Sequence, residues 1–296
     1  MAQRTLDSSP RILPLYARAA AQMVPGASLL PFVPGGGKDV PQTELVLPGV
    51  EPNPDAVADY AKVCGFTLRN DLPPTYPHVL AFPLHMALMA SGDFPFGAVG
   101  LVHIENRIAQ QRRIGIDERL TLRVRATKLE PHPKGRAFTI VSEAHAGEQL
   151  VWEGRSKILR RGKGGGGDGG ARAEAGQPPA EEEWRLEGDL GRRYAGVSGD
   201  RNPIHMHALS AKALGFPRAI AHGMWTKARC LAALDARLPE SFEVEVGFRK
   251  PILLPATVAF GSEETDGEVR FAVRDAGKGT SHLDGRARPI ADPERK

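Results

Sequence analysis

Hydrophobic and polar residues alternate with a period of two over several stretches of the chain. Such alternation is typical of antiparallel strands that bury one face and leave the other in water. It predicts strands at residues 98–108, 118–130 and 136–146, and again at 241–250, 256–264, 268–276 and 280–288. Turn-forming residues at 131–135 and 265–267 separate neighbouring strands.

Two helices precede the strands in each half of the chain. They are predicted at residues 54–64 and 82–89 in the first half and at 190–197 and 223–238 in the second. One long apolar helix packed on several antiparallel strands, twice over, predicts an α+β fold and not a parallel doubly wound sheet. A length of 296 residues also favours two domains.

A segment rich in Gly, Ala and Pro separates the two halves, with the sequence RRGKGGGGDGGARAEAGQPPAEEE at 160–183. It has too few apolar residues to bury a core of its own, and we interpret it as a linker. The predicted organisation is an N-terminal extension, a first half, the linker and a second half, at 1–40, 41–160, 161–182 and 183–296.

Two short blocks recur in the same order on both sides of the linker. YAKVCGF at 60–66 matches YAGVSGD at 194–200, and YPHVLAFPL at 76–84 matches FPRAIAHGM at 216–224. The connection between the blocks is longer in the second copy. Conserved order on both sides of a linker indicates an internal duplication.

The polar residues of the second copy have apolar counterparts in the first. Asp200 aligns with Phe66, the pair His222-Gly223 aligns with Phe82-Pro83, and the stretch NPIH has no counterpart. If these residues only packed the core, we would expect the first copy to carry residues of the same kind at the matching positions. The pattern instead predicts that only the second half carries the chemistry.

The stretch SGDRNPIH, at 198–205, places Asp200 and His205 five residues apart around a turn. An acid and a histidine on one bent segment can share a water molecule, with Pro203 stiffening the turn and Asn202 orienting either group or the substrate. Gly223 begins a predicted helix, where a backbone N–H can stabilise an oxyanion. Together these groups suit the addition of water to a double bond conjugated with a thioester.

The sequence YAGVSGDRNPIH followed by ALGFPRAIAHGM, within 194–224, resembles the MaoC-like or (R)-specific enoyl-CoA hydratase family of hot-dog folds. The first half resembles the N-terminal half of double hot-dog members, which include bacterial 3-hydroxyacyl-thioester dehydratases. The resemblance implies two tandem repeats, each an antiparallel sheet wrapped around a central helix. It also implies a lyase that interconverts (R)-3-hydroxyacyl and trans-2-enoyl thioesters, with Asp200 and His205 as the catalytic pair and Gly223 as an oxyanion donor.

Further residues are expected to contact the substrate. They are Ser198, Pro203, His222, Met224, Arg249 and Lys250. The two basic residues would hold the pyrophosphate or phosphopantetheine of an acyl-CoA or acyl-carrier-protein thioester. Because the substrate brings its own CoA or phosphopantetheine, no separate cofactor and no metal are expected.

Three alternatives stay open. Asp200, His205, His207 and His222 are a candidate metal site, although no H-x-x-x-H pair or cysteine ligand supports it. A thioesterase on the same fold would also use a carboxylate and a water molecule. A non-catalytic protein would bind acyl thioesters without turnover.

Composition narrows the class of protein. Cys64 and Cys230 form no CxxC pair, so buried thiols are expected in place of a zinc ribbon or a disulfide framework. The net charge of +4 is dispersed and not clustered on one helix, which weakens the case for nucleic acid, and we expect no nucleic-acid partner. A modest positive field suits an anionic small ligand equally well, so composition by itself does not decide between the two. With no apolar run of about 18 residues and no signal-peptide pattern, we expect a cytoplasmic protein, either a monomer or a homodimer.

Overall fold

The structure is a computed structural model that describes residues 1–21, 39–97, 100–162 and 176–290. The strands of the first half are β1 (Ala2–Thr5), β2 (Thr43–Val50), β3 (Val102–Gln110), β4 (Leu120–Ala126), β5 (Glu130–His132), β6 (Gly135–Ala146) and β7 (Gln149–Arg161). Those of the second half are β8 (Glu182–Leu186), β9 (Phe242–Phe248), β10 (Ala256–Thr265), β11 (Glu268–Asp275) and β12 (Ser281–Pro289).

The helices are placed similarly in the two halves. They are α1 (Ile12–Ala21), α2 (Pro54–Cys64) and α3 (Tyr76–Met89), then α4 (Leu190–Ser198), α5 (Pro203–Met206), α6 (Ala208–Ala213) and α7 (Gly223–Leu234), with a 3-10 turn η2 (Asp235–Arg237). Among the helices of the described ranges, none is long and apolar enough to cross a membrane.

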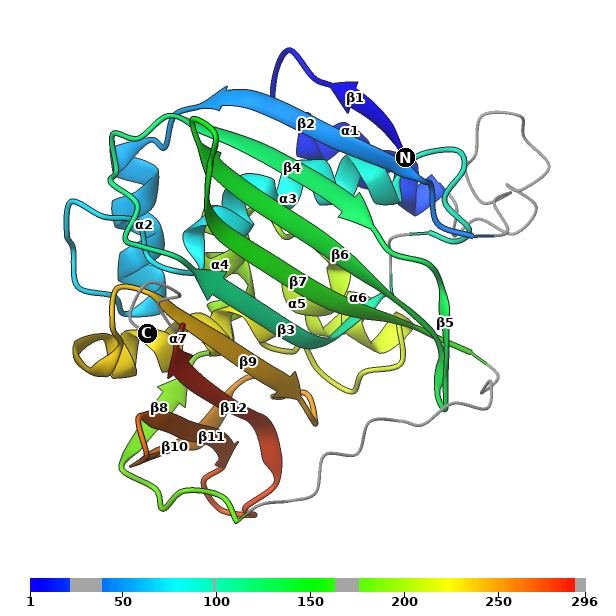
Figure 1. Ribbon diagram of the computed structural model, residues 1–296. Helices are drawn as coiled ribbons and strands as arrows, with labels where there is room; N and C mark the ends of the chain where they lie inside the picture. Colours follow the sequence, from blue (N-terminus) through cyan, green and yellow to red (C-terminus); the bar gives the residue numbers. More distant parts are fainter. Residues whose placement is uncertain (22–38, 98–99, 163–175, 291–296) are drawn as a thin grey trace.

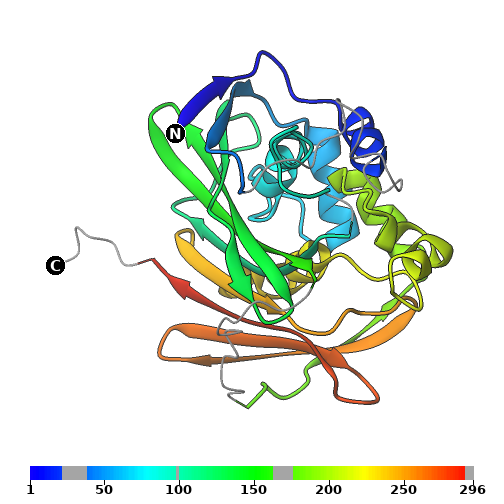
Figure 2. The same cartoon turned by 90° about the vertical axis from the view of Figure 1, so that its right-hand side faces the viewer.

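The strands of the two halves form one sheet with mirrored order. The order β2-β4-β6-β7-β3 in the first half continues into β9-β12-β11-β10-β8 in the second, and β1 adds to the outer edge of β2 (Figure 1). The central pair, β3 and β9, is antiparallel, with Glu105 opposite Gly247 and Gln110 opposite Phe242. The sheet curves around the helices, which lie on its concave side (Figure 2).

A continuous hydrophobic core joins the sheet to the helices of both halves. Leu84 of α3 and Leu231 of α7 are both fully buried and belong to the same cluster. Cys64 and Cys230 are buried free thiols in this core, as expected from the sequence.

The helices α2 and α4 show the internal duplication most directly. Each ends at a left-handed glycine, Gly65 with φ 82° and Gly199 with φ 74°, a backbone conformation that favours glycine. The Tyr60 and Tyr194 rings, which match in the repeat, lie with their centroids 6.1 Å apart. The two copies of the first sequence block therefore form equivalent helices in contact with each other.

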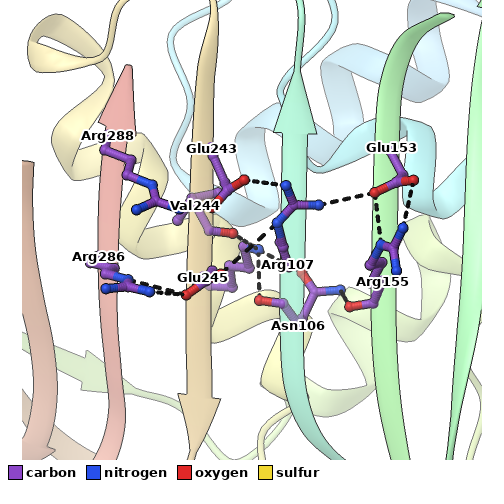
Figure 3. Close-up of polar contacts among 10 residues, drawn as sticks. Asn106, Arg107, Glu153, Arg155, Glu243, Val244, Glu245, Arg286 and Arg288 are labelled. Atoms are coloured by element: carbon purple, nitrogen blue, oxygen red, sulfur yellow. Dashed lines mark hydrogen bonds and ion pairs between the residues drawn. The ribbon is translucent and has the colours of Figure 1, made fainter. Parts of the chain in front are cut away.

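Buried polar groups hold the two halves together at the β3–β9 pair (Figure 3). The fully buried Lys227 of α7 donates hydrogen bonds from Nζ to Asn106 Oδ1 at 2.6 Å and to Val244 O at 3.3 Å. Side chains alternate along a strand, so Arg107 faces the other side of the sheet, where it pairs with Glu153 and Glu243. Burial lowers the pKa of Lys227, and these acceptors compensate its lost hydration.

Most predicted elements are present, with two corrections to the helices. The helix predicted at 82–89 begins at Tyr76, because Pro77 occupies its first turn and Pro83 is accommodated inside a helix buried on nearly all sides. The helix predicted at 223–238 ends at Leu234 and continues only as η2.

The hydrophobic pattern also missed several elements. They are β1, β2, β5, β7, β8, α1, α5 and α6, of which β5 overlaps the turn predicted at 131–135. In β7 the adjacent residues Val151 and Trp152 are both buried, which breaks the alternation that marks a strand.

The predicted linker falls largely outside the described residues, as do positions 98–99 of the first predicted strand. Its last part lies against the second half, where Pro178 O accepts a hydrogen bond from Arg274 and the Glu181 N–H donates to Phe260 O. At the other end of the chain, β1 pairs with β2 and α1 contacts α3, so residues 1–21 are integrated into the fold.

Candidate active site

A cavity of about 370 Å³ lies between the two repeats. The second repeat contributes the segment after α4, the start of α7 and the end of β9, whereas the first contributes α3, β3 and β7. Most of the residues singled out in the sequence line this cavity. Among them, Asp200, His205 and His222 have ligand atoms that all lie within 4.8 Å of one another.

Asp200 follows the left-handed Gly199 at the end of α4 and is half-buried. Its Oδ1 accepts hydrogen bonds from the Tyr16 hydroxyl at 2.9 Å and from the Asn202 N–H at 3.1 Å. Burial alone would raise its pKa, but His222, His205 and these two donors outweigh burial and lower it. The side chain is therefore held as a carboxylate.

His205 lies on the short helix α5, with its ring buried at the cavity wall. Its Nδ1 lies 2.7 Å from Ile220 O. A carbonyl only accepts hydrogen bonds, so Nδ1 carries the proton and Nε2 keeps its lone pair. Burial lowers the pKa of His205, against the opposing effect of Asp200, which leaves a neutral imidazole suited to accept a proton.

His222 contacts both members of this pair. Its ring stacks on that of His205 with centroids 3.6 Å apart, and its Nε2 lies 3.0 Å from the backbone oxygen of Asp200. Burial, with a smaller effect from His205, lowers its pKa to about 3. His222 is therefore a neutral residue that fixes the backbone at Asp200.

The cluster contains part of the candidate metal site predicted from the sequence. Three of its four predicted ligands converge, but His207 is exposed and is not part of the group. His205 Nδ1 and His222 Nε2 are already engaged with backbone carbonyls, which leaves one free nitrogen on each ring.

Gly223 is the first residue of α7 and lines the cavity. The first N–H groups of a helix have no partner within the helix, and the helix dipole favours negative charge there. A Cβ on Gly223 would lie 3.0 Å from the Phe248 ring, so glycine fits here without displacing that ring. The position suits an oxyanion donor, and this role stays a prediction.

The other predicted site residues have different places. Ser198 Oγ donates to Tyr194 O at 2.8 Å and accepts from the Asp200 N–H, while Asn202 Oδ1 caps α5 by accepting from the Ile204 N–H. Pro203 opens α5 and is not among the cavity-lining residues of the described chain. Its predicted contact with substrate is therefore replaced by a role in shaping the turn.

The remaining predictions fall at the cavity itself. Met224 is buried in the wall, and Arg249 and Lys250 lie exposed at the rim. Arg249 is paired with Asp284 at 2.9 Å. The exposed Lys134 and Arg161 of the first repeat also line the cavity, and sequence reasoning did not single them out.

Sequence reasoning also missed Tyr16, His78 and His103, which line the cavity from α1, α3 and β3. Burial lowers the pKa of His78 to about 4 and that of His103 to about 3. Single histidines in apolar segments and a tyrosine far from any motif carry no local signal. Only their position in the fold brings them to Asp200.

Comparisons with known proteins show the family of this chain. The model of the MaoC-like domain matches residues 171–285. The 3-hydroxyacyl-thioester dehydratase X of Mycobacterium tuberculosis is 37% identical over 260 residues, which cover 87% of this chain and 92% of the relative. The crystal structure of HtdX from that organism superposes with a TM-score of 0.76 and 37% identity, covering 83% of this chain and all of that one.

Two more distant structures show the fold alone. Rv0216 of M. tuberculosis, described as a double hot-dog fold, is 14% identical with a TM-score of 0.51, covering 82% of this chain and 93% of its own. An acyl-ACP thioesterase from Bacteroides thetaiotaomicron is 10% identical with a TM-score of 0.51, covering 75% of this chain and 91% of its own.

The chain is thus a double hot-dog protein, and it belongs to the family of MaoC-like dehydratases. Both the fold class and the family predicted from the sequence are confirmed, and the family is one of hydratases and dehydratases.

Proposed function

We propose that this protein interconverts an (R)-3-hydroxyacyl thioester with a trans-2-enoyl thioester and water. The observation that carries the proposal is the convergence of Asp200, His205 and the N-terminus of α7 on one cavity. The name of the relative HtdX, a 3-hydroxyacyl-thioester dehydratase, supports the substrate class. The (R) configuration rests on the family signature in the sequence.

The reaction follows from the protonation states of the site. In hydration, the Asp200–His205 pair accepts one proton from water as the water oxygen bonds to Cβ of the substrate, and then returns one proton to Cα. Between these events the negative charge lies on the thioester oxygen, where the Gly223 N–H stabilises it. Dehydration is the reverse, and neither direction requires a metal ion, a redox cofactor or a covalent intermediate.

The rim and the depth of the cavity suit the two ends of an acyl thioester. Four exposed basic residues line the cavity on the protein surface and favour the phosphates of CoA or phosphopantetheine; they are Lys134, Arg161, Arg249 and Lys250. The first repeat supplies apolar walls, among them Phe82, Met86 and Met89. We therefore place the acyl tail against α3 of the first repeat.

The test follows the absorbance of the conjugated thioester when purified protein is mixed with a medium-length trans-2-enoyl-CoA. Wild type should remove the signal, and chiral analysis of the product should give the (R)-3-hydroxyacyl-CoA. Asp200→Asn and His205→Gln should each lower kcat by about 1000-fold or more, because each removes one member of the proton-transfer pair. His207→Gln is the matched control, because His207 is close in sequence but exposed and outside the cluster.

Other outcomes identify the alternatives. Release of free thiol, detected with a thiol-trapping dye, would indicate a thioesterase. Binding of enoyl-CoA without turnover in wild type, with acyl-carrier-protein thioesters also unchanged, would indicate a non-catalytic binder. A cytoplasmic location and a monomeric or homodimeric state are part of the proposal, the latter measurable by light scattering.

A further inference from the structure

The N-terminal helix α1 lies at the active site although no sequence motif marks it. The MaoC-like domain model begins at residue 171, far beyond α1. The strand β1 pairs with β2 from Ala2 opposite Thr43, and the Leu6 N–H donates to Val46 O at 2.8 Å. These contacts hold the chain just before α1 and bring the helix to the second repeat.

One face of α1 packs on the segment that carries Asp200. Ile12 and Tyr16 are one turn apart and so lie on the same face of the helix. A Cβ on Gly199 would lie 2.5 Å from Ile12 Cδ1, so the glycine that the left-handed turn favours also makes room for α1. The fit between α1 and this turn is therefore close.

Tyr16 forms two hydrogen bonds with this segment. Its hydroxyl donates to Asp200 Oδ1 at 2.9 Å and accepts from the Arg201 N–H at 2.9 Å. A hydroxyl that accepts from an N–H while it donates becomes a stronger donor. The pKa of Tyr16 is raised, first by burial and then by the Asp200 carboxylate, so the hydroxyl keeps its proton.

We propose that Tyr16 is a positioning residue of the active site, and that α1 is the element that orients the Asp200 carboxylate through it. The inference rests on the proposed function, since it assigns Tyr16 a role through Asp200. Oδ1 is fixed by the Tyr16 hydroxyl and the Asn202 N–H, and Oδ2 lies 3.9 Å from His222 Nε2. Oδ2 is therefore the oxygen that we assign to the reacting water.

The surroundings of Asp200 determine what loss of the hydroxyl does. Titratable or charged groups face it from every neighbouring element, namely Tyr16 on α1, His78 on α3, His103 on β3, Tyr194 on α4, Arg201 beside it, His205 on α5 and His222 on α7. The four histidines have lowered pKa values and are neutral near pH 7, and both tyrosines have raised ones. Removing the Tyr16 hydroxyl therefore removes one of the few groups that favour the ionised carboxylate.

The test compares Tyr16→Phe with Tyr76→Phe. Tyr76 is also buried but is not among the cavity-lining residues, so it controls for the loss of a hydroxyl as such. In Tyr16→Phe we expect kcat to fall about tenfold, KM to stay near wild type, and the acid limb of kcat/KM to move up by about one pH unit. Tyr76→Phe should keep the wild-type kcat and pH profile.

Each contrary result has a distinct meaning. A raised KM with an unmoved acid limb would make Tyr16 a substrate contact and overturn the inference, as would a Tyr16→Phe variant equal to wild type. Asp200→Asn is measured in parallel. If that variant is inactive, failure of the Tyr16 prediction concerns Tyr16 alone, whereas an active Asp200→Asn variant would overturn the proposed function together with this inference.

Discussion

The central helices of the two repeats begin at different points of the same aligned block, and this difference explains why the proposed oxyanion donor lies in the second repeat. In the second repeat α7 begins at Gly223, so the N-terminus of this helix lies at the cavity. In the first repeat α3 already begins at Tyr76, and the counterpart of Gly223 is Pro83, inside the helix and without an N–H. An oxyanion donor is therefore excluded at the equivalent position.

The preceding turns lead to the same conclusion. Gly65 and Gly199 end α2 and α4 in the same left-handed conformation, but the next residue is the buried Phe66 in one and Asp200 in the other. The backbone is retained where one side chain has changed. In the proposed mechanism, catalysis thus depends on where a helix starts and on one residue after a turn, and the proposed role of the other repeat is to bind the acyl tail.

The largest effect on stability at neutral pH is expected from a change at the β3–β9 junction between the two repeats. Asn106→Ala removes the 2.6 Å acceptor of the buried Lys227 on the β3–β9 pair. We expect the free energy of unfolding to fall by about 2 kcal/mol, because the buried Lys227 loses its shortest acceptor and keeps only the carbonyl oxygens of residue 106 and Val244, each at 3.3 Å. Urea unfolding measures this loss.

The exposed pair Arg119–Glu51 provides the control for the junction. Arg119→Ala should cost at most about 0.5 kcal/mol, because water already solvates both partners. Equal stability of Asn106→Ala and wild type would mean that the junction does not depend on these polar contacts.

A second experiment tests the difference between Gly223 and Pro83. In Gly223→Ala the new Cβ meets Phe248 at 3.0 Å and obstructs the thioester, so we expect kcat to fall about 100-fold. In Pro83→Ala the first repeat gains an N–H within a helix, and activity should stay at the wild-type level. Steady-state kinetics of both variants decides the matter, and comparable losses in both would contradict an oxyanion role limited to the second repeat.

The third prediction concerns acid stability, to which the first repeat contributes through His78. Its pKa is lowered from 6.5 to about 4 by burial, so the folded protein keeps it neutral while the unfolded chain binds a proton. The stabilisation is complete above pH 6.5, and it is lost as the pH falls toward 4, by about 2 kcal/mol at pH 5.

Variants of His78 isolate this contribution. His78→Phe should lose less stability than wild type between pH 7 and pH 5, as measured by thermal unfolding. The exposed His207→Gln should follow the wild-type curve. Parallel curves for His78→Phe and wild type would refute the contribution of His78.

The smallest effect is expected from filling the tail-binding wall. Met89→Trp adds bulk where α3 lines the cavity. We expect kcat/KM for a long enoyl-CoA to fall about tenfold, since roughly two methylene groups lose their contacts, while a short enoyl-CoA is unaffected. An unchanged preference for chain length would place the acyl tail elsewhere.

The sequence by itself determined the local features of this protein. Three features depend on neighbours within a few residues. They are the left-handed glycine before Asp200, the start of α5 at Asn202-Pro203, and the alternating strands β9 to β12. Their physical causes are backbone sterics and the period of two, which act along the chain. The α+β class followed from these local patterns, whereas the hot-dog fold and the family were predicted from the resemblance of residues 194–224 to the MaoC-like signature, and the candidate catalytic pair from that same motif.

Tertiary structure decided what depends on distant contacts. Tyr16 reaches Asp200 across a separation of 184 residues, and Lys227 reaches Asn106 across 121. The start of α3 at Tyr76 was missed because burial of the helix overrides the two prolines in it. Such contacts form only once the core has assembled, because their energy comes from burial and from partners that no local pattern records.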